Sequence, residues 1–270
     1  MPKATTILFK VLLAAIMIAA LPVAGFGHNL WLNAIDYSPA FSERTGAHTK
    51  IYFGFGHKFP VDDFLDKGKL VEFKLIKPDG KSQDLEPGEG GFLATPLIIK
   101  KKGAHVVSAA TKHGFYTMYL NNGRMNHKMG TKKGLDKVIL SLYYENYTKA
   151  LINVGETSNN AYSTPVGHGI EIVPMENPYL KKAGDTLKLK VLYKGRPAPF
   201  CNVFATYAGF SPTEDYAFTN KTNGKGISTI RILKPGHWIV KAVVRKPAKN
   251  ELQDKCIEEK YSAMISFEVP

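Results

Sequence analysis

Apolar and polar residues alternate along several short stretches of this chain, and this alternation limits its fold more than any other feature. The clearest case is Gly184–Tyr193, where Leu187, Leu189 and Val191 alternate with polar residues. A period of two places successive side chains on opposite faces of a strand, so that one face is dry. Helical spacing is weak except over Leu135–Tyr147, where the aromatic content leaves a strand open as well. The sequence therefore predicts an all-β protein.

Two groups of strands are predicted, one on each side of a polar segment. Residues 155–165 are rich in Ser and Asn, which is typical of a linker. We therefore predict two β-sandwich domains, 28–160 and 166–270. About seven short strands in roughly 100 residues are typical of an immunoglobulin-like sandwich, which we expect for the second domain. The predicted strands are 49–53, 70–76, 97–100, 105–110, 169–174, 184–193, 201–207, 226–232, 237–244 and 263–269.

An export signal is predicted at the N-terminus. Two lysines precede the apolar run Val11–Ala24, which is long enough for a signal-peptide core but short for a membrane span. Small residues at Gly25 and Gly27 fit a signal-peptidase site. Cleavage after Gly27 removes residues 1–27, leaves His28 as the first residue and places the mature protein in the periplasm.

The basic composition does not indicate nucleic-acid binding. The formal net charge is +13, which by itself suggests an acidic partner. The lysines are scattered, however, and the one dense run, 100–102, is followed by Gly103 between two apolar segments, as in a solvated turn. Export also leads away from nucleic acid, so we expect no partner of that class.

The two cysteines, Cys201 and Cys256, both lie in the C-terminal third. Their spacing fits neither a zinc ribbon nor a redox pair. An oxidising compartment permits a bond between them, and we expect a disulfide inside the second domain. Two unpaired thiols are the alternative.

Histidine is the residue type that suggests chemistry. The sequence lacks the nucleophile elbow, the phosphate-binding loop, the dinucleotide fingerprint and the zinc-protease motif, so no enzyme is expected. A mature N-terminal His28 would offer its α-amine and its ring Nδ1 to one cation. The amine titrates near about 7.7–8.0, so a divalent metal can displace its proton. Alternatively, His28 merely opens a first strand, residues 28–32.

Two further histidines are candidate metal ligands. His57 lies in the Gly-rich segment Gly54–Pro60, where a strand ends and a ring can point into a cleft. His168 stands between two glycines at the proposed domain boundary. We expect His28 and His57 to share one metal, with His168 as a third ligand. The alternatives are a loop-capping role for His57 and an exposed linker position for His168.

The other histidines are expected to be structural or solvated. His127 is the one with a chemical neighbourhood, because Met125 and Met129 lie two residues to either side of it. Thioether and imidazole are ligands that suit copper.

Three motifs resemble the bacterial periplasmic domain-of-unknown-function family 4198. They are Trp31 three residues after His28, the segment Gly56–Phe64, and Gly167–Pro174 followed by Asn-Pro. The resemblance covers nearly all of the predicted mature chain. Members are often named nickel-uptake proteins and are associated with cobalt or nickel transporters. The resemblance thus implies a metal ion as cargo and a membrane metal-uptake permease as partner.

Taken together, these features predict a periplasmic binding protein for a divalent transition metal, which delivers the ion to a membrane transporter. Nickel and cobalt are favoured, while copper and zinc stay open because imidazole suits all four. The alternatives are a copper enzyme with an N-terminal histidine brace and a carbohydrate-binding or adhesive sandwich. In the last case, Tyr143, Tyr144 and Tyr147 would stack on sugar.

Overall fold

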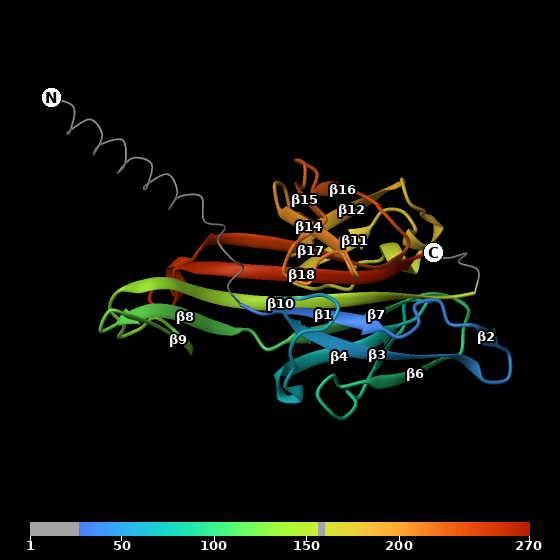
Figure 1. Ribbon diagram of the computed structural model, residues 1–270, viewed down its shortest axis with the longest axis horizontal. Helices are drawn as coiled ribbons and strands as arrows, with labels where there is room; N and C mark the ends of the chain where they lie inside the picture. The colour runs from blue at the N-terminus through green and yellow to red at the C-terminus, as the bar shows by residue number, and fades with distance from the viewer. Residues whose placement is uncertain (1–26, 156–159) are drawn as a thin grey trace.

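In the residues that it describes, the computed structural model of this chain consists of β-strands joined by turns and four short 3-10 helices (Figure 1). The structure describes residues 27–155 and 160–270. Within these two ranges there is no α-helix, and no helix is long and apolar enough to cross a membrane. The prediction of an all-β protein is confirmed. The predicted export signal lies outside the described residues except for Gly27.

Three sheets contain the strands. The first holds β1 (Asn29–Ala34), β2 (Phe41–Ser42), β3 (Gly46–Gly56) and β6 (Thr95–Ile99). The second has the order β15 (Phe218–Lys221), β14 (Asn202–Tyr207), β17 (Gly236–Pro247), β18 (Glu258–Val269), β10 (Val138–Val154), β7 (Gly103–Thr111), β4 (Leu70–Ile76), β5 (Ser82–Asp84), with β8 (Gly114–Asn121) on β10 and β9 (Arg124–Met129) on β8. The third holds β11 (Ile170–Pro174), β12 (Thr186–Tyr193), β13 (Arg196–Pro197) and β16 (Ile227–Arg231).

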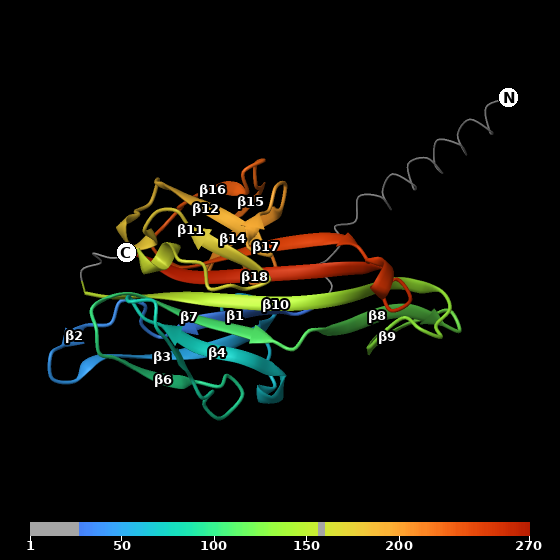
Figure 2. The same ribbon diagram turned by 180° about the vertical axis from the view of Figure 1, so that it is seen from behind.

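The parallel pairing of β10 with β18 joins the two halves of the chain. It runs from Leu142 opposite Glu258 to Ala150 opposite Ser266. Both views show the two strands side by side at the centre of the molecule (Figures 1 and 2). The second sheet, which we call the shared sheet, is therefore continuous across the boundary predicted near residues 160–166. The segment Leu135–Tyr147, for which the sequence allowed either a helix or a strand, lies largely in β10 and is a strand.

The two smaller sheets cover opposite faces of the shared sheet. Thr148 pairs with Met264, so both side chains lie on one face, and Trp31 of β1 packs against Met264 there. The next residue of β10, Lys149, points the other way and forms an ion pair of 3.1 Å with Glu171 of β11. Successive side chains of a strand point to opposite faces, which makes this assignment unambiguous. We call these the β1 face and the β11 face.

Each face of the shared sheet completes a sandwich. β1 packs on β10 and β18, and β11 of the third sheet packs on β18 and β17 from the other side, where the two sheets form an immunoglobulin-like sandwich. Most buried apolar side chains form one cluster that runs through both halves, from Leu30 to Val269, and Trp31, Ile239 and Met264 form a second, small one. Burying one such side chain contributes about 1.5–3 kcal/mol, so the shared core stabilises both halves together.

The predicted disulfide is wrong, because Cys201 and Cys256 are separate free thiols in the structure. The thiol of Cys201 bonds to the carbonyl of Val243 at 3.3 Å. Cys256 lies two residues before Glu258, which pairs with Pro247. Val243 and Pro247 are about 13 Å apart along β17 at roughly 3.3 Å per residue. A disulfide needs Cα atoms within about 7 Å, so the pairing of the strands keeps the two thiols apart.

We expect thiol titration of the denatured, unreduced protein to detect both cysteines. In the native protein Cys201 should react slowly, because burial raises the pKa of its thiol to about 11 and little thiolate forms at neutral pH. A cysteine-free variant, in which Ser replaces both residues, gives the blank. Detection of no thiol in the denatured protein would contradict the structure.

Candidate functional site

The register of β1 on β3 brings His28 and His57 together. Asn29 pairs with Gly56 at the end of the antiparallel ladder. His28, just before Asn29, therefore lies next to His57, just after Gly56. The two imidazole centroids are 5.1 Å apart with their planes at 82°. The ring of His28 also meets the edge of Phe55, at 4.7 Å. Two of the three predicted ligands are therefore neighbours.

Two glycines allow this end of β3 to form. A Cβ at Gly54 would lie 2.0 Å from the indole Nε1 of Trp31, so only glycine leaves room for that ring. Gly56 has φ +131°, and a Cβ there would lie 2.4 Å from the carboxylate of Asp62. Asp62 accepts backbone N–H groups from His57 at 2.6 Å and Lys58 at 3.2 Å. These bonds lower the pKa of Asp62 and hold the turn that presents His57.

The same turn is tied to β1 through one carbonyl. Pro60 accepts hydrogen bonds from Trp31 Nε1 at 2.8 Å and from Asn33 Nδ2 at 2.9 Å. Trp31 and Asn33 each lie an odd number of residues from His28, so their side chains point to the opposite face of the strand from that of His28. The strand that follows His28, β1, thus also anchors the loop that carries His57.

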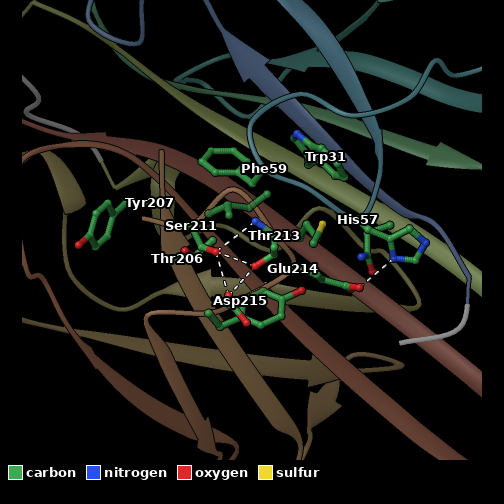
Figure 3. Close-up of a pocket in the computed structure, with 13 residues that line it drawn as sticks. Trp31, His57, Phe59, Thr206, Tyr207, Ser211, Thr213, Glu214 and Asp215 are labelled. Atoms are coloured by element: carbon green, nitrogen blue, oxygen red, sulfur yellow. Dashed lines mark hydrogen bonds and ion pairs between the residues drawn. The ribbon is translucent and has the colours of Figure 1, made fainter. Parts of the chain in front are cut away.

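Glu214 orients the ring of His57. Its Oε2 accepts from Nδ1 of His57 at 3.0 Å, a bond drawn as a dashed line in Figure 3. Its Oε1 lies 4.0 Å from Nζ of Lys241. With the proton on Nδ1, Nε2 of His57 keeps its lone pair. A carboxylate behind an imidazole in this way is the usual outer partner of a metal-binding histidine. Burial lowers the pKa of Lys241 to about 8, while Glu214 opposes that shift.

A small pocket lies between Trp31, His57 and the loop that carries Glu214 (Figure 3). Its volume is about 20 Å³, which is room for about one water. Within the described residues, Oδ1 of buried Asn29, which also lines this pocket, has no hydrogen-bond partner. The hydroxyls of Ser211 and Thr213 both bond to Asp215, so the loop is held by its own side chains. The loop beside this pocket holds Glu214 against His57, and the pocket itself is too small for a ligand.

A much larger cavity, of about 580 Å³, opens on the other side of His57. Its floor is the β1 face of the shared sheet, where Tyr144 pairs with Lys260. Imidazoles, lysines and apolar rings share its wall. The lining includes His28, His57, His113, His127, Lys69, Lys112, Lys260, Phe55, Tyr116, Met129 and Tyr144.

Burial is the main reason why the imidazole of His28 has a lowered pKa. Burial lowers the pKa of its imidazole, His57 and Lys69 lower it as well, and Asp62 and Asp63 act in the opposite direction. An imidazole with a pKa below its usual 6.5 is neutral at pH 7 and can donate a lone pair to a metal.

Lys260 is the most perturbed lysine of this cavity. It is 4% exposed, and burial, followed by the nearby charges of Lys241 and Arg245, lowers the pKa of its amine to about 7. Glu214 acts in the opposite direction. A buried amine that titrates near neutrality, in a cavity, is typical of a functional position.

His168 is not part of this site. Its Nε2 lies 2.8 Å from Oε1 of Glu72, and its ring stacks on Tyr147 at 4.8 Å. Tyr147 lies on the β11 face, an odd number of residues from Tyr144, whereas the cavity lies on the β1 face. The shared sheet therefore separates His168 from the histidine pair. His168 is also 5% exposed, so it is not a solvated linker residue either.

The pair offers two side-chain donors to a metal. In the part of the chain that the structure describes, no group of three or more His, Cys, Asp or Glu residues is placed to hold a metal ion. The α-amine of His28, if the export signal is cut after Gly27, would add one nitrogen. Further donors would have to come from water or from a molecule in the cavity.

Sequence reasoning missed the residues that complete the cavity. His113 and His127 were expected in solvent and are exposed, but both also line this open cavity, and the ring of His127 stacks on Tyr116 at 6.1 Å. The period of two in Met125, His127 and Met129 was a usable signal, because it places all three on one face of β9. Glu214 and Lys260 had no local signal.

The aromatic surface suggested for sugar binding does not form. Tyr144 lines the cavity on the β1 face. Tyr143 and Tyr147 lie on the β11 face and donate their hydroxyls to Glu145, at 2.8 and 2.5 Å. The three rings therefore lie on two sides of one sheet and cannot stack on one ligand.

Residues 25–246 match the family described as Domain of unknown function (DUF4198). The chain belongs to this family. No curated protein matches the DUF4198 chain. Solved structures similar to it include the D0-D1 domain of Intimin, with 14% identity over 88% of this chain and 97% of that one and a TM-score of 0.22. The Clostridium thermocellum CbhA fibronectin(III)-like modules give 9% identity over 89% and 94%, with a TM-score of 0.20. At such scores neither likeness bears on function.

Acid should destabilise this DUF4198 protein through Glu72. Burial raises the pKa of its carboxyl, but hydrogen bonds from His168, Lys74 and Ser108 outweigh that and lower it from 4.5 to about 2. A lowered pKa gives stability that is present above pH 4.5 and lost as the pH falls to about 2. In urea unfolding we expect Glu72→Gln to lose about 1–2 kcal/mol at neutral pH, after allowance for partial exposure, and to show a flatter decline in acid.

Glu89→Gln is the matched control, because Glu89 forms a surface ion pair with Lys67 and its side chain is 90% exposed. That variant should keep the wild-type profile. If Glu72→Gln also keeps it between pH 4.5 and 2, Glu72 does not stabilise the fold in the way described.

Proposed function

We propose that this protein binds a divalent transition metal ion at His28 and His57 and carries it as cargo to a membrane uptake transporter. The observation that supports this is the pair of imidazoles with centroids 5.1 Å apart, in the wall of a large cavity. Imidazole nitrogens suit nickel and cobalt, and also copper and zinc. Nickel and cobalt are favoured by the resemblance of the chain's motifs to proteins named for nickel uptake.

Each residue of the site has a stated part in this proposal. Nε2 of His57 donates to the ion, and Glu214 holds the ring in the tautomer that leaves Nε2 unprotonated. His28 donates from a ring whose lowered pKa keeps it neutral. Export through residues 1–27 would add the α-amine of His28 and place the site in the periplasm.

We propose a carrier and not an enzyme, because release requires a site that does not enclose its ion. Two side-chain donors at the wall of an open cavity leave coordination positions that a transporter's own ligands can take. The sequence also contains none of the nucleophile, phosphate-binding or dinucleotide motifs named above.

Calorimetric titration of the protein that starts at His28 should show one ion bound per chain. We expect His57→Ala to weaken the binding of nickel and cobalt by at least about tenfold, since it removes the imidazole donor that Glu214 orients. His168→Gln should leave the affinity unchanged, because that ring lies on the β11 face. His48→Ala is the surface control, since that ring is exposed and bonds to the carbonyl of Thr45. Equal affinity of wild type and His57→Ala would remove His57 from the site.

A single glycine added before His28 tests the terminal amine. The extension moves the amine away from the ring and breaks the chelate, so we expect the affinity for nickel to fall by about tenfold or more. Mass spectrometry of material recovered from the periplasm shows whether the mature chain begins at His28. Equal binding by the extended and native chains would show that the amine is not a ligand.

A further inference from the structure

One face of the β8–β9 hairpin carries soft metal donors that the histidine pair does not use. Met125, His127 and Met129 alternate along β9, so their side chains share one face of that strand. Met118 of β8 pairs directly with His127, so its thioether lies on the same face. Three of the seven methionines of the chain thus surround one imidazole.

Packing does not account for the exposed members of this group. Met125 and Met129 are 66% and 67% exposed, and among the described strands β9 pairs with β8 alone. Exposed apolar side chains on such an edge strand gain nothing from burial and invite pairing with another chain. Within the described residues, neither ring nitrogen of His127 has a hydrogen-bond partner, and the ring stacks on Tyr116. Both nitrogens are therefore open to a ligand.

The register of the hairpin sets the distances between the donors. Directly opposite residues of antiparallel strands have Cβ atoms about 4.5–5.5 Å apart, as Met118 and His127 do here. Met129 lies two residues beyond His127, which is about 7 Å along the strand. The diagonal from Met118 to Met129 is about 7–8 Å, a distance that long side chains span. The three side chains can therefore close on one ion.

The ring of His127 leans toward Met129 and away from Met125. Its stacking partner, Tyr116, is the residue that pairs with Met129 across the hairpin. His127 and Met129 also both line the large cavity. Met125 is four residues from Met129, about 13 Å along the strand, which is too far for one ion to bind both thioethers.

The chemistry of these donors selects a soft ion of low charge. Thioethers suit Cu(I), whereas hard divalent ions take carboxylate, carbonyl or water ligands. Among the described residues that line the cavity, Glu214 is the one carboxylate, and it already holds the ring of His57. Lys69 and Lys112 line the cavity as well, and an ion of single charge meets half the repulsion that a dication meets there.

We propose that Met118, His127 and Met129 form a second metal site, which binds Cu(I). The site opens into the same cavity as the histidine pair but uses none of its nitrogens, so it is independent of the proposed nickel or cobalt site. Two thioethers and one imidazole hold the ion and leave it open toward the cavity. The bound ion also gives a partner to the imidazole and to the exposed thioether of Met129.

Anaerobic titration with Cu(I), with bicinchoninate as the competing chelator, tests the site in the protein that starts at His28. Loss of even an outer partner of a metal ligand costs about 10–100-fold in affinity, so we expect Met129→Leu and His127→Gln each to weaken binding by at least about tenfold. Met118→Leu, which conserves volume, should have the same effect. X-ray absorption at the copper edge should show sulfur ligands in wild type and fewer in Met129→Leu.

Met125→Leu is the matched control, because Met125 shares the strand, the face and the exposure of Met129. That variant should bind Cu(I) as wild type does. Thiols also bind Cu(I), and Cys201 and Cys256 are free, so a variant with Ala at both positions is compared. It should keep the wild-type affinity as well.

The two metal sites can fail separately. His57→Ala should leave the affinity for Cu(I) unchanged, and Met129→Leu should leave the affinity for nickel unchanged. The inference is overturned if wild type binds no Cu(I), or if Met129→Leu and His127→Gln bind it as tightly as wild type. Loss of Cu(I) binding in Met125→Leu but not in Met129→Leu, or in the variant without cysteines, would also overturn it. None of these results bears on nickel binding at His28 and His57.

Discussion

The pairing of β10 with β18 is the interaction on which the rest of the structure depends. It is the seam where the two halves of the chain become one sheet, and its register fixes which side chains meet across it. Tyr144 and Lys260 are more than a hundred residues apart in sequence, yet they are direct neighbours on the cavity floor. A slip of one residue in this register would exchange the two faces and carry Lys260 away from His28. The cavity therefore belongs to the joined sheet and to neither half alone.

What short-range patterns encode was predictable, and the histidine pair is the best example. The glycines around His57 and the tryptophan after His28 are local signals, and both have a physical reason in the structure: Gly54 gives room to Trp31, and Gly56 turns the chain against Asp62. Strands with clean alternation, such as β4 and β12, were predicted within two residues of their ends. The β8–β9 hairpin was missed although its methionines and histidine alternate.

What depends on pairing between distant strands was not predictable from one sequence. His168 was assigned to the metal site because its glycine neighbours leave room around the ring. In the structure its ring stacks on Tyr147, which lies on the β11 face, because Tyr147 is an odd number of residues from Tyr144 along β10. The disulfide failed for the same reason, since the ladder of β17 holds the two cysteines at separate points. Glu214 approaches His57 from a loop more than 150 residues away, and no local pattern marks it. Composition and spacing carry no information about register at that range.

Each face of the shared sheet carries a buried lysine, and the charges around the two lysines differ. On the β11 face, Lys149 pairs with Glu171 at 3.1 Å, and that carboxylate also accepts the backbone N–H groups of Val166 and Gly167. Both charges of this pair thus have a protein partner, as a structural ion pair requires. On the β1 face, Lys260 is buried among Lys241 and Arg245 and faces a cavity. Burial and these two cations lower the pKa of the Lys260 amine to about 7, and Glu214 acts in the opposite direction.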